Sequence, residues 1–225
     1  MGRLRFAMLL VLGACGPSEV TPPTPDTVGG AGTGESFDPD PFAVKRVRLE
    51  QTTGDNAVNA GLSLACSDGN GTKENSWYRV FALKDFGVDK PFQVNRVNFG
   101  VQTAIGEQRV KVSIGTYDGA AGSVELDTSK VDLIGLTTIA VPEGKLQMLQ
   151  ANFPGIMVSP DANLVVEVKT EGRGEGAFFY LGATTSPEMM PGYLRAPGCN
   201  AANPLMTSAL GYSQTHLLIS VSGAY

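Results

Sequence analysis

The chain has 225 residues and a formal net charge of −5, from 17 Lys and Arg against 22 Asp and Glu. Nucleic-acid binding depends on clustered Lys and Arg, and this sequence contains no such cluster, which excludes a nucleic-acid partner. The 28 glycines and 14 prolines, beside many β-branched and aromatic residues, favour strands joined by turns.

The first fifteen residues have the layout of an export signal. Arg3 and Arg5 make a positive start, and an apolar run follows over residues 6–12. A helix that spans the hydrocarbon layer needs about 20 apolar residues, so this run is too short to cross a membrane and instead has the length of a signal-peptide core. The run ends in Leu12-Gly13-Ala14-Cys15.

These last four residues resemble the lipobox of bacterial lipoproteins. The resemblance implies that residues 1–14 are a signal peptide removed by signal peptidase II. It also implies that Cys15 receives a diacylglycerol on its thiol and a fatty acid such as palmitate on its new amine. Two or three acyl chains hold a protein firmly on a membrane. Gly16 follows Cys15 where an Asp would imply inner-membrane retention, so we expect an outer-membrane location, on the periplasmic or cell-surface face. The alternative is an ordinary secretory signal with an incidental cysteine.

Residues 15–41 form the next segment, which is Pro- and Thr-rich in its first half and Gly-rich in its second. Residues 16–44 hold five acidic residues and no Lys or Arg. Such a composition buries too little apolar surface to offset the entropy of ordering the chain. We therefore predict a disordered tether that follows the lipidated cysteine.

Residues 42–225 are predicted to form a single all-β domain, an antiparallel, jelly-roll-like β-sandwich of about nine strands. Apolar and polar residues alternate along it with the period of two that half-buried strands show. The clearest runs are residues 47–49, 77–81, 92–101, 110–114, 131–141, 145–153, 164–170, 178–181 and 215–221. The alternation changes phase near Asn95-Arg96, which predicts a bulge there. Residues 83–86 predict one helical turn, and residues 171–175 predict a hairpin tip.

Three short motifs in this region also carry a resemblance. They are residues 77–83 (WYRVFAL), 85–88 (DFGV) and 97–101 (VNFGV), with Leu133-Ile134-Gly135 and Gly198-Cys199-Asn200 further on. Together they resemble the non-catalytic β-sandwich modules of secreted bacterial proteases and surface proteins, over most of residues 60–223. The resemblance implies a jelly-roll-like fold and an accessory role without a named ligand.

With Cys15 lipidated, two cysteines remain. In an oxidising compartment Cys66 and Cys199 most simply form a disulfide, and the alternative is two unpaired thiols. Zinc sites built on several His or Cys ligands are then excluded by count.

The sequence predicts that the chain is not an enzyme. His216 is the only histidine, it lies in the last predicted strand, and no Gly-x-Ser-x-Gly motif accompanies it. We interpret it as a structural residue, partly exposed or hydrogen-bonded. Carboxylates on strands and loops do not single out a pair for glycoside hydrolysis, which leaves a hydrolase as a remote alternative.

Two features are candidates for ligand binding. We expect no cofactor, and calcium is considered only as a less favoured possibility. Asp68, Asn70 and Glu74 offer oxygen ligands of the kind that calcium prefers, although an Asx-rich turn explains them equally. Trp77, Tyr78 and Tyr193 are candidate ligand-facing aromatic residues that could stack on sugar rings, and the alternative is that they pack in the core.

These observations lead to three hypotheses for the function. The first is a membrane-anchored surface lipoprotein that acts as a non-catalytic binding or adhesion module for an envelope component, a matrix polysaccharide or a partner protein. The second is a structural or assembly lipoprotein of the envelope without a small ligand. The third is a hydrolase.

Overall fold

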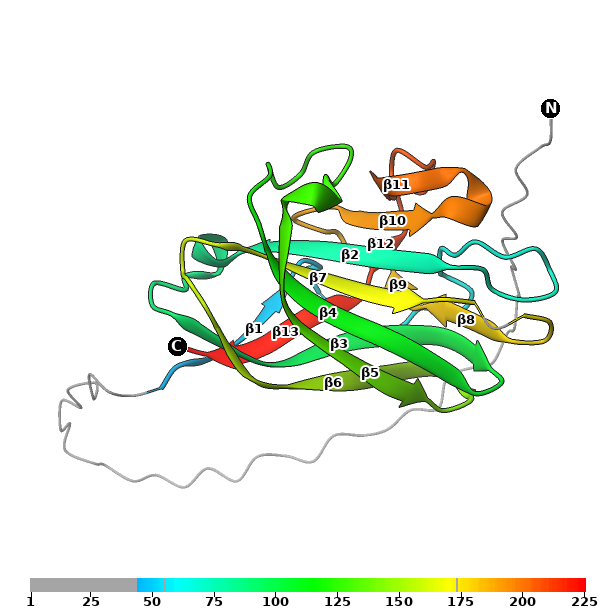
Figure 1. Ribbon diagram of the computed structural model, residues 1–225, viewed down its shortest axis with the longest axis horizontal. Coiled ribbons are helices and arrows are strands. Elements are labelled where there is room, and N and C mark those ends of the chain that lie inside the picture. The colour runs from blue at the N-terminus through cyan, green and yellow to red at the C-terminus, as the bar shows by residue number, and fades with distance from the viewer. Residues whose placement is uncertain (1–43, 55, 173) are drawn as a thin grey trace, which may run out of the picture.

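The structure is a computed structural model that describes residues 44–54, 56–172 and 174–225. The predicted signal peptide, the tether and Cys15 lie outside the described residues. The described chain folds into two antiparallel sheets packed face to face, so the predicted all-β sandwich is confirmed (Figure 1). Every strand pair is antiparallel.

One sheet has five strands and the other has six. The five-stranded sheet contains, in order, β1 (Arg46–Glu50), β13 (Ile219–Ala224), β3 (Phe92–Ile105) and β6 (Gly144–Val158), and β8 (Phe178–Leu181) pairs with β3 as well. The six-stranded sheet contains, in order, β11 (Ala201–Met206), β10 (Gly192–Ala196), β2 (Asn75–Ala82), β7 (Asn163–Thr170), β4 (Gln108–Tyr117) and β5 (Val131–Val141). Strands β9 (Ala183–Thr184) and β12 (His216–Leu217) form a two-stranded sheet.

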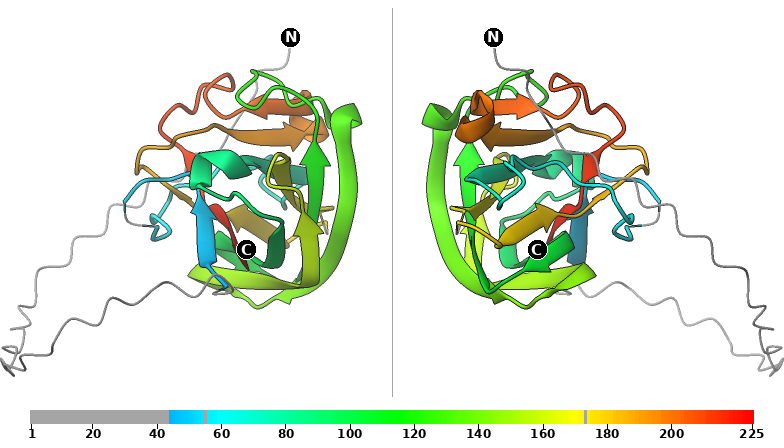
Figure 2. Two further views of the ribbon diagram at one scale, coloured as in Figure 1. Left: turned by 90° about the vertical axis from the view of Figure 1, so that its left-hand side faces the viewer. Right: turned by 90° about the vertical axis from the view of Figure 1, so that its right-hand side faces the viewer.

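Three short 3₁₀ turns complete the described elements, namely η1 (Leu83–Phe86), η2 (Thr128–Lys130) and η3 (Pro197–Cys199). The two sheets are joined along one side by β5 and β6, which follow each other in the chain and curve around the sandwich (Figure 2).

The main core fills the space between the sheets because alternate residues of each strand point inward. Along β4, Val110, Val112 and Ile114 are at most 1% exposed. Trp77 of β2 meets Phe179 of β8 across the core, with ring centroids 5.6 Å apart in an edge-on contact.

A second, smaller cluster lies on the outer face of the six-stranded sheet. Tyr78 and Tyr193 are cross-strand neighbours there, and they pack with Val165, Leu126 and other buried residues. The segment 118–130 covers them and is held by two backbone hydrogen bonds, Leu126 N to Pro204 O at 3.0 Å and Met206 N to Val124 O at 2.9 Å. The segment 118–130 therefore buries part of the outer face of the six-stranded sheet.

Several local predictions are confirmed. The bulge predicted near Asn95-Arg96 appears as a register shift between Val94 and Arg96 in the pairing of β3 with β6. The helical turn predicted at 83–86 is η1, and the strands predicted at 131–141 and 178–181 have those bounds. The disulfide joins Cys66 to Cys199, with an S–S distance of 2.07 Å.

Two predictions are wrong. The described residues contain thirteen strands instead of about nine. Three of the extra strands, β9, β10 and β11, are short strands in a stretch rich in Pro and Gly that shows little alternation, and the fourth arises because the run predicted at 215–221 is divided into β12 and β13. The segment 171–175, in which Arg173 lies outside the described residues, is not a hairpin tip. It follows β7 in the six-stranded sheet and leads toward β8, which pairs with β3 in the other sheet, so it is part of a crossover between sheets.

Leu146 in β6 has an unusual backbone conformation. Its φ is +53°, in the left-handed region that costs an L-residue about 1–2 kcal/mol, and its side chain is 49% exposed. Little packing is lost if this side chain is removed. We expect Leu146→Gly to be more stable than Leu146→Ala by about 1 kcal/mol, because only glycine relieves the strain. Urea unfolding of the two variants tests this, and equal stability would show that the backbone is not strained there.

Candidate functional site

The outer face of the five-stranded sheet presents two aromatic rings. Phe179 and Leu181 of β8 point into the core and are fully buried, so Phe178 and Tyr180 point to the outer face and are half-buried. Their rings are nearly parallel, with centroids 6.1 Å apart and an interplanar angle of 22°. We call these two residues the aromatic stack.

Strand β3 supplies the surface beside the aromatic stack. Ile105 pairs with Phe178 and Thr103 pairs with Tyr180 in the β3–β8 ladder. The side chain of Ile105 is 46% exposed and extends the apolar surface toward the end of the sheet. In a regular strand Val101 and Thr103 would point to the same face. A register shift between them lets Val101 point into the core while Thr103 pairs with the outward-facing Tyr180.

A hollow lies further along β3 on the same outer face. It has a volume of about 410 Å³. Its lining residues are Arg48, Asn56, Ala57, Asn98, Met148, Leu149 and Gln150. The register of β3 with β6 places Asn98 opposite Gln150 and Gly100 opposite Met148. We call this feature the amide hollow, since three of its lining side chains are carboxamides.

Hydrogen bonds orient two of these carboxamides. Asn98 Nδ2 donates to Ser222 Oγ at 3.1 Å, and Asn56 Oδ1 accepts from Thr52 Oγ1 at 2.5 Å. Asn56 Nδ2 also donates to a carboxylate oxygen of Glu50. Glu50 forms an ion pair with Arg48, so the one charged side chain that lines the amide hollow has a counter-charge beside it.

Strand β3 pairs with β13 up to Phe99 and with β8 from Val101 onward, so Gly100 lies at the change of partner strand. Its N–H donates to Leu218 O at 2.9 Å, and its carbonyl accepts from Gly182 N at 2.8 Å. A Cβ added to Gly100 would lie 2.8 Å from Val58 Cγ2. The side chain of Val58 therefore packs directly on the backbone of Gly100, where any larger residue would clash with it. The segment 56–58 thus lies against the outer face and borders the amide hollow.

The aromatic residues predicted to face a ligand do not do so. Trp77 is fully buried in the core, where its indole Nε1 donates to Leu64 O at 2.6 Å. Tyr78 is 7% exposed and Tyr193 is 1% exposed beneath the segment 118–130. The prediction is therefore wrong for all three. On the outer face of the five-stranded sheet, the rings of Phe178 and Tyr180 are half-buried instead. The three consecutive aromatic residues at 178–180 were the available signal, because a strand cannot bury all of them on one face.

Tyr78 forms a buried contact with a carboxylate. Its hydroxyl donates to Glu167 Oε1 at 2.7 Å, and Ser113 Oγ donates to Glu167 Oε2 at 3.0 Å. Burial and the neighbouring Glu167 raise the pKa of Tyr78 well above its ordinary value of 10.0. The folded state therefore keeps a proton that the unfolded chain loses above about pH 10.

We expect the free energy of unfolding to fall as the pH rises past about 10, because only the unfolded state then gains from ionising Tyr78. Tyr78→Phe should cost about 1.5 kcal/mol at pH 7, through the lost hydrogen bond to Glu167, and should flatten the alkaline decline. Urea unfolding from pH 7 to 11 measures both effects. An unchanged slope in the variant would assign the decline to other groups.

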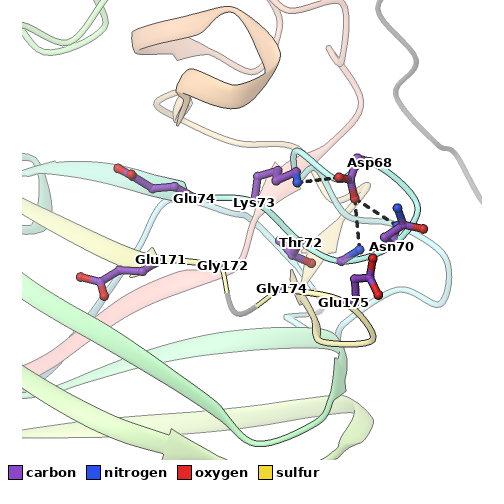
Figure 3. A pocket seen from close by; sticks show the side chains of 10 residues that line it. Asp68, Asn70, Thr72, Lys73, Glu74, Glu171, Gly172, Gly174 and Glu175 are labelled. Carbon is purple, nitrogen blue, oxygen red and sulfur yellow. Dashed lines mark hydrogen bonds and ion pairs between the residues drawn. The ribbon is translucent and has the colours of Figure 1, made fainter.

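The residues predicted as calcium ligands border a second hollow, of about 300 Å³ (Figure 3). Asp68 Oδ1 accepts from the backbone N–H of Asn70 at 3.0 Å and of Gly71 at 3.2 Å, which is an Asx turn. Asp68 Oδ2 lies 2.5 Å from Lys73 Nζ. The hydrogen bonds from Lys73 and Asn70 lower the pKa of Asp68.

Glu74 lies apart from Asp68 and Asn70, and its carboxylate points away from them (Figure 3). Its Oε1 is 2.6 Å from Arg195 Nη1 and 3.2 Å from Lys169 Nζ, and these cations lower its pKa. The three predicted ligands therefore do not converge on one point. Among residues 44–54, 56–172 and 174–225, no group of three His, Cys, Asp or Glu side chains is placed to hold a metal ion. Calcium binding remains a prediction.

A buried charge cluster lies where β2 meets the two-stranded sheet. Arg79 is fully buried, and its guanidinium donates to Glu188 Oε2 and Met190 O, both at 2.6 Å, and to Leu217 O at 2.7 Å. His216 is 9% exposed, with its Nδ1 3.0 Å from Glu188 Oε1. This arrangement agrees with a structural histidine. The strand pattern did not reveal Arg79, which occupies an inward position between Trp77 and Phe81.

Comparison with protein-family models, with curated proteins and with solved structures gave no match. Within the described part of the chain, no helix is long and apolar enough to cross a membrane.

Proposed function

We propose that this chain is a lipid-anchored, non-catalytic binding module of a bacterial envelope, and that it binds an envelope component through the outer face of its five-stranded sheet. The lipobox-like Leu12-Gly13-Ala14-Cys15 supports the anchor. The observation that supports the binding face is the alignment of the aromatic stack and the amide hollow along the single strand β3. Half-buried rings and oriented carboxamides on one face give both apolar contact and directional hydrogen bonds.

The anchor is tested by Cys15→Ser in the producing bacterium. We expect incorporation of labelled palmitate to be lost and the protein to be released in soluble form or kept as the uncut precursor. Cell fractionation and lipid labelling measure this. A variant that stays in the membrane fraction and is still labelled would refute lipidation at Cys15.

The binding face is tested with two exposed residues of the amide hollow. The full chain, purified in detergent, is incubated with an envelope preparation of the producing bacterium, and the bound fraction is measured after sedimentation. We expect the double variant Met148→Ala, Gln150→Ala to bind at least tenfold more weakly. Leu136→Ala is the matched control, because Leu136 is 57% exposed on β5 of the other sheet.

Two results would contradict the proposal. Equal binding by the hollow variant and the wild-type chain would show that another surface is responsible. Absence of binding by the wild-type chain would favour a structural or assembly lipoprotein without a ligand of this kind.

A further inference from the structure

We infer that the ligand of this face is an uncharged polysaccharide, whose sugar rings pack on Phe178 and Tyr180 while its hydroxyl groups bond to the carboxamides of the amide hollow. This inference rests on the proposed binding function and names its ligand class.

The aromatic stack suits the apolar faces of sugar rings. A pyranose ring presents C–H groups on its faces, and the π-face of an aromatic ring carries partial negative charge that attracts them. Phe178 and Tyr180 are held from below, since Phe179 between them is fully buried against Trp77. Tyr180 also has a hydroxyl group at the end of its apolar ring. The rings are therefore positioned by the fold before any ligand binds.

The amide hollow suits hydroxyl groups. Each carboxamide has two N–H donors and one carbonyl acceptor, so it matches a hydroxyl group, which donates one hydrogen bond and accepts others. Asn98 is 8% exposed, and its bond to Ser222 Oγ fixes the orientation of its amide. A rigid amide loses little entropy when it binds a ligand.

The charges of the hollow favour a neutral ligand over an anionic one. Arg48 is the single charged residue of the lining, and it is paired with Glu50, which in turn accepts from Asn56 Nδ2. A carboxylate or sulfate on the ligand would compete with Glu50 for Arg48 and would be repelled by Glu50. A neutral hydroxyl group meets no such repulsion.

The spacing of the two features favours a chain of sugars over a single one. Thr103, which pairs with Tyr180, lies five residues along β3 from Asn98. At about 3.3 Å per residue this separation is roughly 16 Å, which exceeds the width of one ring. A ligand that contacts both features must therefore extend over several sugar units and pass over Val58, which packs on Gly100 between them.

The test uses the full chain in detergent and the envelope preparation, divided into three portions. One portion is untreated, and one is treated with periodate, which breaks the carbon–carbon bond between adjacent carbons that each bear a hydroxyl group. The third is digested with proteinase K and washed. We expect periodate to abolish binding and protease digestion to leave it unchanged.

Tyr180→Ala should weaken binding about tenfold and Tyr180→Phe by less than threefold, because the ring makes the main contact. Phe178→Ala should resemble Tyr180→Ala.

The outcomes separate this inference from the proposed function. Binding that survives periodate but is lost after protease digestion would overturn the polysaccharide and leave a protein partner on the same face. Periodate-sensitive binding that Phe178→Ala and Tyr180→Ala do not weaken would overturn the role of the aromatic stack. Absence of binding to the untreated portion would contradict the proposed function itself. Thermal unfolding of each variant, with Leu136→Ala as the control, confirms that the compared proteins are folded.

Discussion

Glu188→Gln is expected to destabilise the fold by about 3 kcal/mol, although it changes only one oxygen atom to an NH₂ group. The guanidinium of Arg79 is fully buried and has Glu188 as its counter-charge. A buried charge that loses its partner costs roughly 3–5 kcal/mol, and we expect the low end because the side chain of Glu188 is 15% exposed. Urea unfolding at pH 7 measures the loss.

The control for this experiment is Glu171→Gln. Glu171 also contacts a cation, Lys111 Nζ at 2.5 Å, but its side chain is 62% exposed. Water screens such pairs, so we expect little change in the free energy of unfolding. Similar losses in Glu171→Gln and Glu188→Gln would show that burial of Arg79 is not the cause.

A double-mutant cycle isolates the pair. Arg79→Met removes the charge but also leaves the carbonyls of Met190 and Leu217 without this donor, so it is destabilising in its own right. In the background of Arg79→Met, the further change Glu188→Gln should cost much less than 3 kcal/mol, because no buried cation then requires the carboxylate. An additive result would mean that the two side chains are not coupled.

Removal of the disulfide by Cys66→Ala with Cys199→Ala is expected to lower the free energy of unfolding by about 4 kcal/mol. The bond closes a loop between residues separated by 133 positions, and a crosslink of this length restricts the unfolded chain strongly. It connects the segment before β2 to η3, which lies between β10 and β11. For a domain of this size the loss corresponds to a fall in Tm of roughly 8–16 °C.

Thermal unfolding of the double variant and of the wild-type chain in reductant tests this prediction. Both should show the same fall in Tm, since β10 already pairs with β2 and the folded contacts persist without the bond. A fall below about 2 °C would indicate that the unfolded chain is restricted by other contacts. If Tm fell for the wild-type chain in reductant but not for the double variant, the reductant itself and not the loss of the disulfide would be the cause.

Much of the architecture was predictable from local patterns. The period-two alternation of Val110, Val112 and Ile114 predicted a strand with one buried face, because the direction of a side chain in a strand depends only on its position. The change of phase near Asn95-Arg96 predicted the bulge for the same reason. The disulfide followed from the number of cysteines, since Cys66 and Cys199 alone remain once Cys15 is assigned to the lipid.

Tertiary structure decided which of the outward residues are exposed. Alternation places Tyr78 on the outer face of its sheet, opposite to the inward-facing Trp77. The distant segment 118–130 then covers Tyr78, and nothing in the strand pattern indicates that cover. Phe178 and Tyr180 follow the same alternation and remain half-buried.

Local sequence patterns thus predicted most of the strands, their buried faces and the disulfide. Local patterns did not predict that β3 carries both the aromatic stack and the amide hollow, or that Arg79 contacts Glu188 from 109 positions away. The physical reason is that alternation is a property of neighbouring residues. Strand register, coverage of a face and the pairing of a buried charge depend on segments that are remote in the chain.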